Sequence, residues 1–77
     1  MTYLADLTIG TRAQVFGIHG DGPIVQRLLE MGMLKGEDVE VIGLAPFGDP
    51  IEIRLRDYRL CLRRSEAALI QVERTTR

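Results

Sequence analysis

The chain has few of the residues on which several protein classes depend. It contains one cysteine and no tryptophan, and only 5% of its 77 residues are aromatic. A single cysteine forms no disulfide within the chain, which excludes a disulfide-stabilised scaffold and indicates a reducing cytosol. The longest runs without a charged residue, 41–48 and 13–20 (with the histidine neutral), span eight residues, whereas a membrane helix needs about 18 or more. The sequence therefore predicts a cytoplasmic domain without a membrane-spanning segment.

Catalytic and metal-binding patterns are also missing. One histidine, one cysteine and few hydroxyls supply no set of nucleophile, base and orienting group. The glycines at 20 and 22 lack the lysine and the spacing of a phosphate-binding loop. His19, Asp21 and Cys61 are the candidate metal ligands, one of each side-chain type. They are not spaced closely in the sequence as the ligands of typical metal sites are. We therefore expect no enzymatic activity, no bound metal and no cofactor.

The composition is that of an ordinary globular domain. Hydrophobic residues make up 45% of the chain and charged residues 27%, with a net charge of −1. A chain of 77 residues forms a small core but no second layer around a deep cleft. We therefore expect a single domain over 1–77.

One helix is predicted, and a glycine ends it. Pro23 suits the first helical position because no hydrogen-bond donor is needed there, and Leu28 and Met31 lie on one predicted face. Gly32 ends the helix in the left-handed conformation that residues with a Cβ avoid. In such a Schellman motif Leu28 and Met33 are in contact. Gly32→Ala is therefore expected to destabilise the domain by about 1 kcal/mol or more.

On both sides of this helix the apolar residues alternate, as in strands with one buried face. Residues 12–18 are predicted as the first strand, with Phe16 in the core. The other predicted elements are a strand containing Val39 and Val41, a hairpin of 51–56 and 59–63 that reverses at 57–58, a helical turn capped by Ser65, a last strand at 69–72 and a frayed tail at 73–77.

About five short strands in so small a chain favour a closed barrel. Closure removes strand edges that 77 residues could hardly cover in another way. The predicted fold class is therefore mainly β: a small SH3-like barrel of about five strands, with one α-helix inserted after the first strand and a short helical turn before the last. An OB-like barrel is the alternative.

The apolar residues at the helix end favour a protein interface. Two methionines and two leucines gather there, and methionine is adaptable and common at interaction surfaces. The competing interpretation is that these side chains are core, which helical spacing favours for Met31 above all. The candidate partner-binding residues are Leu28, Met31, Met33 and Leu34, with Phe47 on the long loop as a second wall of the groove.

Basic residues concentrate late in the chain and allow two interpretations. They form either a solvated barrel face, balanced by Glu52, Asp57 and Glu66, or a binding stripe for nucleic acid or an acidic partner. The net charge of −1 and the lack of tryptophan count against nucleic acid. The solvated face is preferred, with acidic-partner contact next. The residues are Arg54, Arg56, Arg59, Arg63 and Arg64.

Three separated motifs together resemble the FeoA family of bacterial ferrous iron transport: RLLEMGMLKG at 27–36, APFGDPIEI at 45–53 and RLCLRRSEAALIQVE at 59–73. The resemblance implies an SH3-like barrel in the cytosol that acts with FeoB, a membrane permease bearing a GTPase domain, and has no reaction of its own. The related domain also occurs at the carboxy terminus of iron- and manganese-dependent repressors. Asp57 stands where the family commonly has glycine. Cys61 replaces a small residue and could add a weak metal or redox site.

The functional hypothesis is a non-enzymatic accessory protein of ferrous iron uptake. It docks on the GTPase region of a FeoB-like permease through the helix-end segment and regulates or assembles the transporter. Nucleic-acid binding and direct membrane insertion are not expected. The alternative is a small-barrel nucleic-acid-binding domain or an accessory domain of a metal-dependent repressor, although no DNA-reading helix-turn-helix precedes the predicted barrel.

Overall fold

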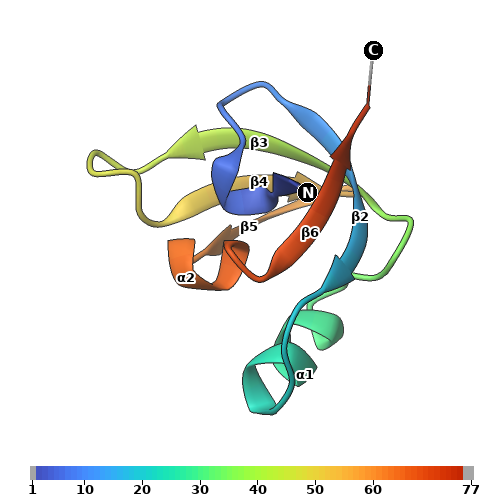
Figure 1. The fold of residues 1–77 in the computed structure, drawn as a ribbon. Helices are drawn as coiled ribbons and strands as arrows, with labels where there is room; N and C mark the ends of the chain where they lie inside the picture. The colour runs from blue at the N-terminus through green and yellow to red at the C-terminus, as the bar shows by residue number, and fades with distance from the viewer. Residues whose placement is uncertain (1, 76–77) are drawn as a thin grey trace.

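The computed structural model describes residues 2–75, and it confirms the mainly β architecture (Figure 1). The elements in chain order are β1 (Thr2–Tyr3), a 3-10 helix η1 (Leu4–Asp6), β2 (Arg12–Ile18), α1 (Pro23–Glu30), β3 (Asp38–Leu44), β4 (Ile51–Leu55), β5 (Tyr58–Leu62), α2 (Arg64–Ala67) and β6 (Ile70–Arg74). Neither α1 nor α2 is long and apolar enough to cross a membrane.

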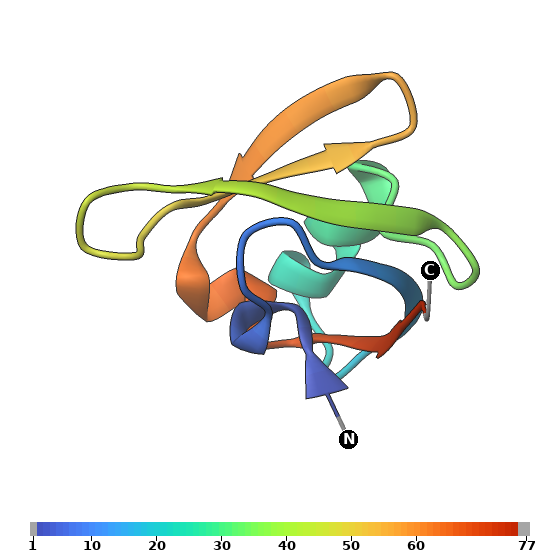
Figure 2. The same ribbon diagram turned by 90° about the horizontal axis from the view of Figure 1, so that it is seen from above.

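All six strands belong to one antiparallel sheet in the order β1-β6-β2-β3-β4-β5. Seen from above, the strands curve around a common interior (Figure 2). Within residues 2–75, β1 and β5 form the two edges and share no ladder, so the barrel is open between them. The prediction of about five strands missed β1, a two-residue strand that pairs Thr2 with Val72.

The interior is filled by the alternating residues of the strands. Ile51, Ile53 and Leu55 point inward from β4 and are at most 1% exposed, as period-two alternation predicts. Their neighbours on β3, Val39 and Val41, are buried with them. The segment before β2 completes this core with Leu4, Ala5 and Leu7, although the sequence indicated no element there.

Arg64 braces the open side of the barrel. Its guanidinium donates to the carbonyl oxygens of Ala5 in η1 (3.0 Å) and Gly48 in the β3–β4 loop (3.1 Å). Its backbone N–H donates to Asp49 Oδ1 at 2.9 Å. Arg64 thus connects three segments that are distant in the chain and holds the β3–β4 loop in one conformation.

Three local predictions need correction. The β4–β5 turn consists of Arg56 and Asp57 rather than 57–58, because Tyr58 already pairs with Leu55. The cap of α2 is Arg63 rather than Ser65. The predicted tail is a strand as far as Arg74, since β6 pairs with β2 up to that residue, and residues 76–77 lie outside the described part.

Candidate partner-binding surface

The end of α1 has the geometry that the glycine stop predicts. Gly32 has φ +105°, and its N–H donates to the Leu29 carbonyl at 3.0 Å. The N–H of Met33 donates to the Leu28 carbonyl at 3.1 Å. These two bonds define a Schellman motif. We call residues 31–37, which connect α1 to β3, the joint segment; in Figure 1 it runs from the end of α1 up beside β2 to the start of β3.

The same motif removes two residues from the predicted partner surface. Leu28 is 0% exposed and Met33 is 1% exposed, so both side chains belong to the core. The physical reason is that a Schellman motif folds the residue after the glycine back against the last turn of the helix. Met31 is partly buried against the core. Leu34 is 45% exposed, which makes it the most accessible of the four predicted residues at the helix end.

Phe47 is exposed but does not form a second wall beside these residues. The joint segment precedes β3, and Phe47 lies in the loop that follows it. A seven-residue strand separates its two ends by about 20 Å. Figures 1 and 2 both show β3 running from the joint segment to this loop. Phe47 is 98% exposed at the opposite end of the molecule, so the predicted single groove does not form.

Two aromatic residues that the sequence interpretation did not place here flank the joint segment. The Tyr58 hydroxyl donates to the Met31 carbonyl at 2.9 Å, although Tyr58 was expected in a turn. The Lys35 ammonium lies 5.1 Å from the centroid of the Phe16 ring, within the range of a cation–π contact. Phe16 is 44% exposed and Tyr58 is 46% exposed.

The prediction that Phe16 is core was wrong, and the alternation of β2 could have shown it. Ala13 and Val15 are buried, so period two turns residue 16 outward. We call the four residues Phe16, Met31, Leu34 and Tyr58 the joint surface. They are partly or well exposed, and each of them lies in the joint segment or contacts a residue of it.

Beside the joint surface, Arg56 and Glu37 form a two-pronged ion pair. Arg56 Nε and Nη2 donate to the two carboxylate oxygens of Glu37 at 2.9 and 2.5 Å. The hydrogen bonds from Arg56 lower the pKa of Glu37. The pair ties the β4–β5 turn to the joint segment, and Arg56 adopts φ +57° in that turn.

We expect the stability difference between the wild-type protein and Glu37→Gln to shrink as the pH falls. Because the folded-state pKa of Glu37 is lowered, the ionised carboxylate stabilises the fold above the pKa of the unfolded chain. That contribution disappears as the pH falls through the folded-state pKa. Urea midpoints of both proteins, measured from neutral pH down into acid, check this. A difference that is constant with pH would contradict it, and added salt should reduce the neutral-pH difference because the pair is accessible to solvent.

Three of the five late basic residues have partners within residues 2–75. Arg64 binds backbone carbonyls, Arg56 binds Glu37, and Arg54 Nη1 lies 3.4 Å from Glu40 Oε1. Glu66, which was expected to balance these arginines on the surface, is 6% exposed. It accepts the Arg63 N–H at 2.8 Å and forms an ion pair with Arg27, which connects α1 to α2.

The candidate metal ligands lie on different parts of the barrel. His19 and Asp21 are exposed in the connection between β2 and α1, whereas Cys61 is exposed on β5 opposite Glu52. Over residues 2–75, no three histidine, cysteine, aspartate or glutamate side chains converge as a metal site would require. The positions of these residues therefore provide no argument for metal chemistry.

Comparison with known proteins agrees with the resemblance in the motifs. A family model described as the FeoA domain matches residues 2–74. The chain is 40% identical over 70 residues to an Fe(2+) transport protein A/Fe(2+) transporter FeoB fusion protein of Porphyromonas gingivalis. That match covers 91% of this chain, and the chain spans only 8% of the fusion protein.

Solved structures share the fold. The NMR structure of a FeoA-like protein from Clostridium acetobutylicum is 38% identical, with a TM-score of 0.89 over 100% of this chain and 93% of that one. The crystal structure of Stenotrophomonas maltophilia FeoA with zinc, described as a procaryotic SH3 domain protein, is 32% identical. It has a TM-score of 0.83 over 95% of this chain and 91% of that one. The SH3-like fold is thereby confirmed, and the chain belongs to the FeoA domain family.

Proposed function

We propose that this chain is a non-enzymatic cytoplasmic accessory protein that docks on the GTPase region of a FeoB-like permease through the joint surface. Docking regulates the permease or assists its assembly. The P. gingivalis protein supports a FeoB-like partner, because it joins an iron transport protein A part and a FeoB part in one chain. A binding protein biases its partner only if its affinity differs between the states of the partner. We therefore expect the affinity to depend on the bound nucleotide.

The observation that carries this proposal is the rigid presentation of the joint surface. Leu34, Phe16 and Tyr58 each keep more than two-fifths of their surface exposed. The backbone beneath them is held by the Schellman bonds and by the Tyr58–Met31 hydrogen bond. Aromatic residues are enriched among the side chains that dominate binding energy. A surface that is already ordered loses little conformational entropy on binding.

A pair of matched leucines tests the docking site. Leu34 and Leu44 are 45% and 41% exposed; Leu34 lies in the joint segment before β3, and Leu44 is the last residue of β3. We expect Leu34→Glu to weaken binding to the purified GTPase region of the permease by about tenfold or more, because it places a charge in an apolar contact. Leu44→Glu should change the affinity by less than about twofold, since it lies outside the joint surface.

Calorimetric titration with GDP and with a non-hydrolysable GTP analogue measures these affinities. Circular dichroism verifies that both variants fold. Equal losses in the two variants would place the contact elsewhere on the barrel. Failure of the wild-type protein to bind in either nucleotide state would refute the docking proposal.

A further inference from the structure

The outer face of the sheet carries a row of charged residues that the fold does not explain. In the strand register, Arg12 on β2 lies opposite Glu40 on β3, and Glu40 lies opposite Arg54 on β4. Arg54 in turn lies opposite Arg59 on β5. Residues in register across antiparallel strands share one face of the sheet. The row therefore places three guanidinium groups and one carboxylate side by side across four strands. We call these four residues the arginine row.

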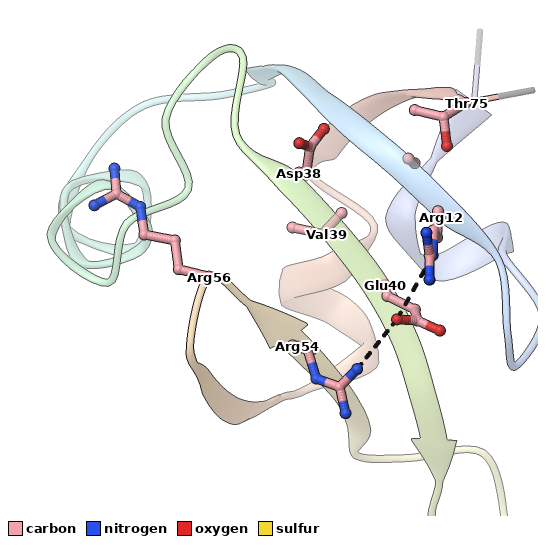
Figure 3. Close-up of a pocket in the computed structure, with 8 residues that line it drawn as sticks. Arg12, Asp38, Val39, Glu40, Arg54, Arg56 and Thr75 are labelled. Atoms are coloured by element: carbon pink, nitrogen blue, oxygen red, sulfur yellow. Dashed lines mark hydrogen bonds and ion pairs between the residues drawn. The ribbon is translucent and has the colours of Figure 1, made fainter. Parts of the chain in front are cut away.

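Glu40 balances the arginine row incompletely. Its Oε1 atom lies 3.4 Å from Arg54 Nη1 and 3.9 Å from Arg12 Nε, so one oxygen faces both arginines and only the first contact is a hydrogen bond. Figure 3 shows the Glu40 carboxylate between these two side chains. Each guanidinium carries five N–H donors. Most of the donors in the row are therefore directed to solvent.

Arg59 makes the imbalance larger. It lies directly opposite Arg54, and like charges opposite each other on a sheet are destabilising. Over residues 2–75, Arg59 takes part in no ion pair. By contrast, Arg56 has both prongs on Glu37 and points away from the row (Figure 3). The row has a formal charge of +2 on a protein whose net charge is −1.

The row borders a shallow groove of about 420 Å³. Arg12, Arg54 and Arg56 line it together with the carboxylates of Asp38 and Glu40. The accessible guanidinium groups of Arg12 and Arg54 suit a short acidic peptide, because guanidinium groups bind carboxylates in a planar two-pronged geometry. Nucleic acid fits less well, because none of the groove-lining residues is aromatic and the protein is acidic overall.

We propose that the arginine row is a binding site for an acidic peptide segment of a protein partner, whose carboxylates bind the free N–H donors of the three arginines. In the unbound protein the Glu40 carboxylate faces Arg12 and Arg54, so it competes with an incoming carboxylate for their donors. The site is separate from the joint surface. It is tested without the permease, so either proposal can fail alone.

The test uses a hexaglutamate peptide as the probe and a hexaglutamine peptide as the uncharged control. Titration into the ¹⁵N-labelled protein should shift the backbone amides of β2, β3 and β4 and the side-chain Nε–H signals of the row. Hexaglutamine should shift none of them. Arg54→Gln and Arg59→Gln should each weaken hexaglutamate binding by about tenfold, because each removes charge-assisted donors.

Two further variants separate this site from general attraction of charge. Glu40→Gln should bind hexaglutamate about threefold more tightly, since it removes the competing carboxylate, and a gain cannot result from misfolding. Lys35→Gln removes the same charge as the arginine variants but lies outside the groove, so it should leave the affinity unchanged within about twofold. An equal loss in Lys35→Gln, an unchanged Glu40→Gln, or tighter binding of an RNA oligonucleotide than of hexaglutamate at physiological salt would each overturn the proposal.

Discussion

Gly32→Ala is expected to lower the free energy of unfolding by about 2–4 kcal/mol. Two effects add. A side chain at φ +105° is strained, and a Cβ at this position would lie 2.9 Å from the Tyr58 hydroxyl and 3.1 Å from Leu55 Cδ2. Leu55 is a core residue, so moving its side chain would disturb core packing. The Tyr58 hydroxyl donates a hydrogen bond to the Met31 carbonyl, which would be weakened if the hydroxyl moved. Thermal or urea unfolding measures the effect.

Gly36→Ala is the matched control for the steric part. Gly36 has φ +95°, yet a Cβ there would have no neighbour within 4 Å. Its replacement should therefore show the backbone strain alone, about 1 kcal/mol. In a Tyr58→Phe background the cost of Gly32→Ala should fall, because the closest contact is removed. Equal costs for Gly32→Ala and Gly36→Ala would show that close packing against the β4–β5 hairpin contributes nothing at the joint segment.

Leu28→Ala is expected to cost about 2–5 kcal/mol, the range for a large core side chain. Leu28 is fully buried and lies under the Schellman motif against Met33. The neighbouring Leu29→Ala makes the same chemical change on the same helix at a position that is 38% exposed. It should cost less than about 1 kcal/mol.

Comparing these two variants by urea denaturation decides the role of Leu28. If Leu28→Ala costs no more than Leu29→Ala, Leu28 is available to a partner as the sequence suggested. If Leu28→Ala is too unstable to measure, Leu28→Met supplies the intermediate case, because a volume-conserving change in a core costs less than about 1.5 kcal/mol. A Leu28→Met cost well above about 1.5 kcal/mol would contradict a core site that tolerates a side chain of similar volume.

Elements with strong local signals were predicted closely. The helix begins at Pro23 and stops before Gly32 as expected, because a proline start and a glycine cap act within one turn of the chain. Strand β2 has the predicted bounds of 12–18, and β4 buries the predicted face. The family resemblance was confirmed, since a FeoA domain model matches residues 2–74. By contrast, β1 was missed, since a two-residue strand has no period to detect.

The candidate site was predicted only in part, for a different reason. Met33 and Leu34 are adjacent and both apolar, yet one is buried and the other is 45% exposed. The direction that each side chain takes depends on how the joint segment packs against the rest of the barrel. Tyr58 reaches Met31 across 27 positions of the sequence, and no local pattern reports such a contact. The arginine row likewise joins residues of four strands through their register.

The sequence by itself determined the helix, its glycine stop, the change of period at the joint segment and the family. These features depend on residues within a few positions of one another, where backbone conformation and side-chain spacing are coupled. Only the tertiary structure decided that Leu28 and Met33 are core, that Tyr58 contacts Met31 and Phe16 contacts Lys35, and that Phe47 lies at the far end of β3. Exposure is a property of packing between segments that are distant in the chain, so the same apolar motif supplies both the core and the proposed docking surface.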